Sequence, residues 1–193
     1  AMQTMISNRV DEKYRKWMSD YNLLSGEVQE ELSKMKSGDL SISMKDTVYT
    51  FPESKMESPR ETSHKVLQSV CEVNPLLIGG SADVGTSTKT YLENSTDFSS
   101  TNYLGRNIWY GVREGAMGAI MNGISLGGLR NYGSTFLAFS DYLKPAIRLS
   151  ALMNLPNIYI FTHDSVMIGP DGPTHQPVEQ LISLRSIPNM EVF

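Results

Sequence analysis

Short apolar runs alternate with helical patterns along residues 58–193, and this alternation constrains the fold more than any other feature of the chain. Strands are predicted at Leu76–Ile78, Ile108–Tyr110, 133–139 and Asn157–Phe161. Segments with helical periodicity separate them. Strands connected through helices pair in parallel, with right-handed crossovers. The sequence therefore predicts an α/β fold: a parallel sheet with helices on both faces.

Ligands of such sheets bind beyond the carboxyl ends of the strands. Gly79–Asp83 follows the first predicted strand and is expected to be a loop of this kind. The chain contains neither a GxGxxG fingerprint nor a GxxxxGK[ST] motif. A generic nucleotide-binding domain is therefore disfavoured.

The segment Gly111–Gly123 predicts a tight turn and then a helix that begins at Glu114. Gly115, Gly118 and Gly123 are poor helix formers, so we expect something to approach the surface of this helix closely. An acid at a helix start interacts favourably with the helix dipole. Without further evidence, Glu114 would be interpreted as an acid that stabilises the start of the helix.

Ser58-Pro59-Arg60-Glu61 has the pattern of a capping box and predicts a helix that runs to about Val73. Arg60 alone would be a surface residue, although a planar guanidinium also suits a phosphate. We expect His64 to be ordinary surface. Cys71 is the single cysteine, which excludes an intramolecular disulfide, and it is expected to be a small buried residue.

Two of the three histidines follow the strand predicted at 157–161, within Thr162-His163-Asp164-Ser165 and Asp171-Gly172-Pro173-Thr174-His175. His163, Asp171 and His175 could be metal ligands by residue type, but their spacing matches no zinc motif. The aromatic residues Phe136, Phe139 and Tyr142 are spaced by three. Spacing alone favours a place in the core for them.

Together these motifs resemble the pyrimidine-binding domain of the transketolase family, from about Arg60 to Phe193. The matching segments are Gly79–Asp83, the Glu114 helix, Thr135–Tyr142 and, most specifically, the two histidine motifs. The resemblance implies a transferase of the pentose phosphate pathway that uses thiamine diphosphate. Its reaction moves a two-carbon ketol unit between sugar phosphates.

The resemblance also implies roles for individual residues. The catalytic residues would be Glu114, whose carboxyl group shares a proton with N1' of the aminopyrimidine, together with His163 and His175. The cofactor would be held by Glu114 and by Asp83, Val84, Phe136, Phe139 and Tyr142. The substrate would be bound by Arg60, Ser87, His163, Asp171 and His175, with its phosphate group on Arg60, Ser87 and His163.

Three positions depart from the usual family pattern. Gly115 stands where a larger residue, often His, is common; Val84 replaces a common Leu; Pro170 replaces a common acid. These departures keep open a non-catalytic assembly module with the same fold. Another thiamine diphosphate enzyme, such as a 1-deoxyxylulose-phosphate synthase or a ketoacid dehydrogenase β subunit, is the nearer alternative. Arg60, Ser87 and the first histidine motif favour transketolase.

The family anchors its metal and diphosphate through a Gly-Asp-Gly motif, which this sequence lacks. The resemblance therefore implies that Mg²⁺ or Ca²⁺ is bound by a domain absent from this chain, with no metal ligand here. The chain would supply the aminopyrimidine half of a site that lies between two subunits of a homodimer, and would be inactive alone. Met190–Phe193 is expected to start another strand, so we expect a piece of a longer enzyme.

Residues 1–50 predict a helical interdomain linker, with helices over 10–21 and 28–35, and residues 51–193 form the predicted pyrimidine-binding domain. The net charge of −4 and the lack of a basic patch argue against nucleic acid as a partner. No apolar run approaches the roughly 20 residues of a membrane span, and no signal peptide is visible. These features fit a cytoplasmic protein.

Overall fold

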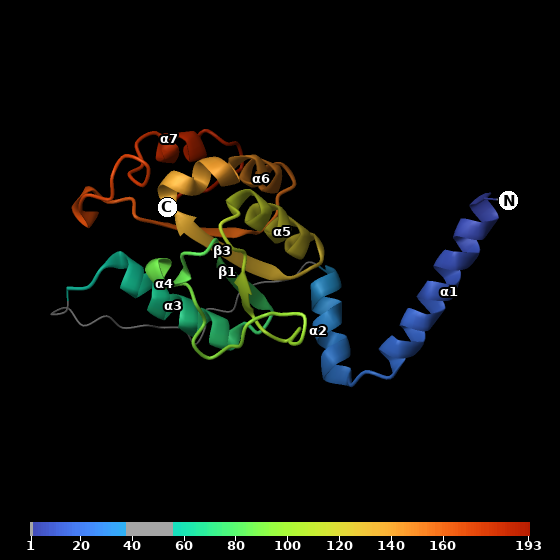
Figure 1. Ribbon diagram of the computed structural model, residues 1–193. Helices are drawn as coiled ribbons and strands as arrows, with labels where there is room; N and C mark the ends of the chain where they lie inside the picture. Colours follow the sequence, from blue (N-terminus) through green and yellow to red (C-terminus); the bar gives the residue numbers. More distant parts are fainter. Residues whose placement is uncertain (1, 38–55) are drawn as a thin grey trace. The chain divides into compact units, whose positions relative to one another are not determined.

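The computed structural model describes residues 2–37 and 56–193, which belong to two compact units, Ala1–Leu40 and Ser41–Phe193 (Figure 1). The first unit holds α1 (Met2–Asn22) and α2 (Gly26–Ser37), so both predicted helices are confirmed, α1 being much longer than expected. The ring of Trp17 stacks on Tyr21 at 5.1 Å, and Lys36 Nζ lies 4.2 Å from the centre of the Trp17 ring. Residues 38–50 of the predicted linker lie outside the described residues. No described helix is long and apolar enough to cross a membrane.

The second unit is built on a four-stranded parallel sheet in the order β2-β1-β3-β4. The strands are β1 (Leu77–Ser81), β2 (Asn107–Trp109), β3 (Arg130–Phe136) and β4 (Ile158–Thr162). The helices are α3 (Pro59–Val73), α4 (Gly85–Thr88), α5 (Glu114–Leu126), α6 (Ser140–Leu152) and α7 (Gln180–Arg185), with 3-10 turns at Leu137–Phe139 and Val166–Ile168. The predicted fold class is confirmed.

Each face of the sheet has its own core, and Figure 1 shows α3 on one side of the strands with α5 and α6 on the other. Tyr132 belongs to the first core, with Leu67, Cys71, Leu77 and Leu92. The second core contains Met117 and Met121 of α5, Leu143, Ile147 and Ala151 of α6, and Leu184 and Ile187. Cys71 is buried as predicted, and desolvation raises the pKa of its thiol to about 11.

The sequence misplaced several strand ends. Gly79, Gly80 and Ser81 belong to β1 rather than to a loop. A side chain at Gly80 would collide with the carbonyl group of Ile108 in the neighbouring strand, which explains why glycine stands there. β3 begins at Arg130 and ends at Phe136, because Leu137–Phe139 turns into a 3-10 helix. Residues 190–193 form no strand; Met190 and Val192 pack against the core beneath α5 and α6 instead.

The close approach expected at the glycines of α5 is found at two of the three. A methyl group at Gly118 would lie 2.6 Å from Cβ of Ala146 and 2.8 Å from Cδ1 of Leu143, both in α6. At Gly115 it would lie 3.1 Å from the carbonyl oxygen of Tyr142. Nothing lies within 4 Å of the same position at Gly123. Glycine therefore lets the first half of α5 pack tightly on α6.

Gly118 and Gly123 give a matched pair of substitutions in one helix. We expect Gly123→Ala to raise the free energy of unfolding by about 0.5–1 kcal/mol, because alanine is the better helix former. We expect Gly118→Ala to lower it, because overpacking costs about 1–3 kcal/mol and outweighs that gain. Urea unfolding followed by circular dichroism measures both. Equal stability of the two variants would contradict the close packing of α5 on α6.

Candidate functional site

The residues predicted to form a site follow different strands but gather at one edge of the sheet. Asp83 follows β1, Glu114 follows β2, Phe136 ends β3 and His163 follows β4. All four strands are parallel, so their carboxyl ends lie along the same edge. This edge is therefore the candidate functional site.

Arg60 reaches this edge from the first turn of α3. Ser58 caps the helix as predicted, with its hydroxyl oxygen accepting from the amide of Glu61 at 3.4 Å. The Glu61 carboxylate forms an ion pair with Lys89 at 2.9 Å rather than completing a capping box. The Arg60 guanidinium donates through Nη1 to the carbonyl oxygen of Ser87 at 3.0 Å. Two of the predicted substrate residues are therefore in direct contact.

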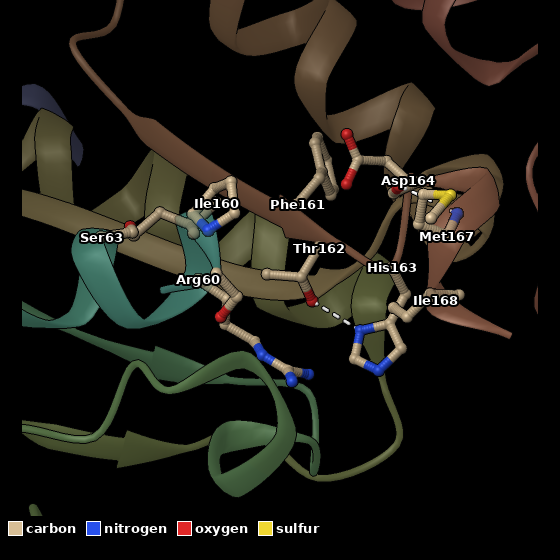
Figure 2. Close-up of a pocket in the computed structure, with 12 residues that line it drawn as sticks. Arg60, Ser63, Ile160, Phe161, Thr162, His163, Asp164, Met167 and Ile168 are labelled. Carbon is tan, nitrogen blue, oxygen red and sulfur yellow. Dashed lines mark hydrogen bonds between the residues drawn. The ribbon is translucent and has the colours of Figure 1, made fainter. Parts of the chain in front are cut away.

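A cavity of about 550 Å³ lies between the start of α3 and the end of β4. Arg60 and His163 line it, and Figure 2 shows the guanidinium and the imidazole ring directed toward the same side. Ser58, Ser63, Ile160, Thr162, Asp164 and Met167 are among the other lining residues. The cavity has the size and the mixed polarity of a small-molecule site. Its cationic side chain suits an anionic ligand.

The predicted aromatic residues form a row that includes both histidines. The ring of His163 stacks on Phe136 at 3.6 Å between centroids, and Phe136 stacks on Phe139 at 5.7 Å. Tyr142 continues the row at 6.2 Å from Phe139, and His175 meets Phe139 edge-on at 5.1 Å. Tyr142 is 66% exposed, so the row runs from the core to the surface. The expectation from spacing alone, a place in the core, is wrong for Tyr142.

The two histidines are held by their neighbours along the chain. Thr162 Oγ1 lies 2.9 Å from Nδ1 of His163, and Thr174 Oγ1 lies 2.8 Å from Nδ1 of His175. Desolvation lowers the pKa of His163, and the positive charge of Arg60 lowers it further, whereas the Asp171 carboxylate acts in the opposite direction. Arg60, His163, Asp171 and His175 therefore share one electrostatic environment.

Two predicted site residues have backbone angles that non-glycine residues seldom adopt. Asp83 has φ of 65° and His163 has φ of 59°, both in the left-handed region. Such conformations cost free energy and concentrate at functional sites. In each case the residue lies just beyond the end of a strand, so the unusual angle turns the chain at the carboxyl edge of the sheet.

Glu114 is the first residue of α5 and is only 8% exposed. Its carboxylate makes no hydrogen bond or ion pair with any other described residue. Asp83 is exposed, and Val84 is half-buried ahead of α4, with its amide donating to Ser81 Oγ at 3.0 Å. Within the described part of the chain, no hydrogen bond or ring contact joins these three residues to the row of aromatic rings. The described residues also contain no group of three or more His, Cys, Asp or Glu placed to hold a metal ion.

His64 is not the ordinary surface residue that the sequence predicted, since its side chain is 18% exposed. Its Nδ1 lies 2.8 Å from the carbonyl oxygen of Lys89, and its Nε2 lies 3.2 Å from the Glu93 carboxylate. One turn further along α3, Gln68 donates to the carbonyl oxygen of Tyr91 at 2.8 Å and accepts from the amide of Glu93 at 3.0 Å. The half-buried face of α3 that carries His64 and Gln68 thus fixes residues 89–93, in the segment that follows Ser87. Only the four-residue spacing of His64 and Gln68 hints at this in the sequence.

Comparison with known proteins identifies the family of the chain. Residues 56–193 match the family model described as the transketolase pyrimidine-binding domain. Transketolase of Bacillus subtilis is 45% identical over 187 residues, which are 95% of this chain and 28% of the relative. Transketolase of Staphylococcus aureus is 45% identical over 195 residues, covering 99% of this chain and 30% of the relative.

The structural comparison leads to the same family. The transketolase of Pichia stipitis, solved in complex with sedoheptulose-7-phosphate, superimposes with a TM-score of 0.83 at 38% identity. The match covers 94% of this chain and 28% of that one. The fold and the family match define a pyrimidine-binding domain. The chain belongs to the transketolase family, and it spans about 28% of the length of the curated relatives that it matches.

The surroundings of His163 predict how its pKa responds to substitution. Arg60→Gln should raise the pKa of His163, because a nearby positive charge disfavours the imidazolium form. Asp171→Asn should lower it further, because the carboxylate favours that form. Titration of the His163 ring protons by NMR measures both pKa changes. An unchanged pKa of His163 in both variants would mean that the Arg60 and Asp171 side chains lie away from the ring.

The same shift fixes the sign of the pH dependence. The folded pKa lies below the ordinary histidine value of 6.5, so the unfolded chain takes up the proton first as the pH falls. His163 therefore lowers stability as the pH falls through 6.5 toward its folded pKa. Arg60→Gln should weaken this dependence, and Asp171→Asn should strengthen it.

Proposed function

We propose that this chain forms the aminopyrimidine-binding half of a transketolase active site. The whole protein would transfer a two-carbon ketol unit between sugar phosphates, in the pentose phosphate pathway of the cytoplasm. The observation that carries the proposal is the cavity that Arg60 and His163 line beside the row of aromatic rings, with the main chain of Ser87 in contact with Arg60. In this assignment residues 1–50 are the interdomain linker and residues 51–193 the pyrimidine-binding domain.

The chain offers a surface that fits the aminopyrimidine ring of thiamine diphosphate. Phe136, Phe139 and Tyr142 lie in contact one after another, with Tyr142 exposed, and flat rings stack well on aromatic faces. Asp83 and Val84 would complete this binding surface from the end of β1. When bound, thiamine diphosphate supplies the nucleophilic carbon that carries the ketol unit.

Glu114 is the proposed acid–base residue. Its carboxyl group is nearly buried at the start of α5 and has no partner among the described residues, so its oxygens remain available to a ligand. A carboxyl group placed in this way can share a proton with a ring nitrogen. We propose that Glu114 has this role at N1' of the aminopyrimidine.

The substrate end of the site is proposed to lie at Arg60 and His163. Arg60 keeps donors besides the one given to Ser87, and a guanidinium binds phosphate oxygens through parallel hydrogen bonds. His163 faces the same cavity. Ser87 would add a hydroxyl group to the phosphate site, while Asp171 and His175 would contact the hydroxyl and carbonyl groups of the sugar.

The proposed partner is a second copy of the full-length protein. The outer face of α5 is exposed although it is apolar, and it includes Ala116, Ala119, Ile120 and Leu126. A second subunit packed near this face would lie close to Glu114. We propose that its diphosphate-binding domain contributes Mg²⁺ or Ca²⁺ and the ligands for that metal, and that neither nucleic acid nor membrane is a partner.

Glu114→Gln in the full-length protein tests the acid–base role. Gln is of similar size but cannot exchange a proton with the ring nitrogen. We expect hydrogen–deuterium exchange at C2 of the bound cofactor to slow by about 10²- to 10⁴-fold, as is typical when a positioned acid–base group is lost. Thermal unfolding is the control and should change little.

If Glu114 only stabilises the helix start, the same change should cost at most about 1 kcal/mol of stability with near-normal exchange. Exchange within about threefold of wild type, far below the expected range, would refute the relay role and favour a non-catalytic assembly module.

Arg60→Ala tests the phosphate site separately. We expect KM for sugar phosphates to rise while kcat changes less, because the lost contact stabilises the bound ground state and the transition state alike. Arg148→Ala, on the exposed side of α6, is the matched control and should leave both constants unchanged. A KM for sugar phosphates that is the same in both variants would remove Arg60 from the phosphate site.

A further inference from the structure

Each histidine of the site is preceded by a threonine whose hydroxyl group contacts its ring. The Thr162–His163 and Thr174–His175 pairs both join Oγ1 to Nδ1, at 2.9 Å and 2.8 Å. In both pairs Nε2 is the nitrogen left for a ligand. The two threonines differ in burial, since Thr162 is 9% exposed at the end of β4 whereas Thr174 lies in an exposed loop.

The surroundings of Thr162 decide the direction of its hydrogen bond. Nδ1 of His163 is the only acceptor that its hydroxyl group reaches among the described residues. If the hydroxyl accepted a proton from Nδ1, its own hydrogen would have no acceptor among the described residues and would face only the cavity that Thr162 lines. If the hydroxyl donates, both groups are satisfied. Water can serve the exposed Thr174 in either direction.

The position of the His163 ring is also fixed. Thr162 pairs with Phe136 in the sheet, so its backbone cannot shift without disturbing β3 and β4. The imidazole stacks on the ring of Phe136, which sets the plane of the imidazole. With the plane fixed and Nδ1 held by Thr162, Nε2 has one direction in which to bind.

We propose that Thr162 is a positioning residue whose hydroxyl donates to Nδ1 of His163 and so keeps the ring proton on Nε2, ready to donate to a phosphate oxygen. A neutral imidazole has one N–H, and the hydrogen bond at one nitrogen sets which nitrogen carries it. Desolvation and then Arg60 lower the pKa of His163, so the neutral form is the one whose tautomer matters. The use of the Nε2 proton rests on the proposed function, but the tautomer itself does not.

Nitrogen NMR of the histidine rings in this chain tests the tautomer directly. The chain has three histidines, so each ring can be assigned, and His64 is an internal reference because its contacts come from α3, Lys89 and Glu93. In the wild type we expect the Nε2-protonated form of His163. Thr162→Val, of the same shape and well suited to a strand, should shift His163 toward a mixture of tautomers. Thr162→Ser should restore the wild-type spectrum.

Thr174→Val is the matched comparison, and it should change the His175 tautomer less because water can replace the exposed hydroxyl. A His163 spectrum that is the same in the wild type, Thr162→Val and Thr162→Ser would overturn the proposal. So would a wild-type ring protonated on Nδ1. If Thr162→Val fails to fold, the wild-type spectrum still tests the proposal. Protonation of His163 on Nε2 supports it, and protonation on Nδ1 overturns it.

Kinetics of the full-length protein separates positioning from mere structure. Thr162→Val should raise KM for sugar phosphates by about tenfold, the order expected for one hydrogen bond to a charged group, with a smaller change in kcat. Thr162→Ser should reverse the effect. If the tautomer responds as expected while Glu114→Gln and Arg60→Ala leave the reaction unaffected, the positioning of the ring stands and the proposed function fails.

Discussion

The pairing of β3 with both of its neighbours is the constraint on which the rest of the domain depends. β3 lies between β1 and β4, and six consecutive residues from Asn131 to Phe136 are buried. The register sets Ser134 beside Ser81 and Phe136 beside Thr162. β3 and β4 therefore end level with one another, whereas β1 ends beside Ser134, two residues before the end of β3. The segments after β1 and β4 emerge at the edge of the sheet that carries the aromatic row.

At the opposite end of the sheet, a cluster of polar side chains joins the strands to α5 and α6. Asn157, just before β4, donates to Asn122 of α5 at 2.7 Å and to Ser150 of α6 at 3.0 Å. Asn131 at the start of β3 donates to the Asn157 side chain at 2.9 Å. Hydrogen bonds have definite directions, so this cluster sets the rotation of α5 and α6 over the sheet, whereas the methionines between them could adapt to several arrangements.

The sequence predicted the fold class, the start of α3 and the start of α5, because hydrophobic periodicity and capping act locally. It failed where a distant residue decides the outcome. Gly79 and Gly80 are poor strand residues, yet they belong to β1, where Tyr132 of β3 and Ile108 of β2 leave no room for side chains. The site residues were predicted through motifs that resemble a family pattern, but the Arg60–Ser87 contact and the contacts of His64 are tertiary and no local pattern encodes them.

The contact between Arg60 and Ser87 has a consequence for how this site tolerates variation. The guanidinium is oriented by a main-chain oxygen, which every amino acid possesses, rather than by the serine hydroxyl. Residue 87 can therefore change without releasing the arginine, provided that α4, which contains it, keeps its course into the segment held by His64 and Gln68. A substitution at this position would remove the hydroxyl group proposed for the phosphate site, while the main-chain contact that orients Arg60 would stay in place.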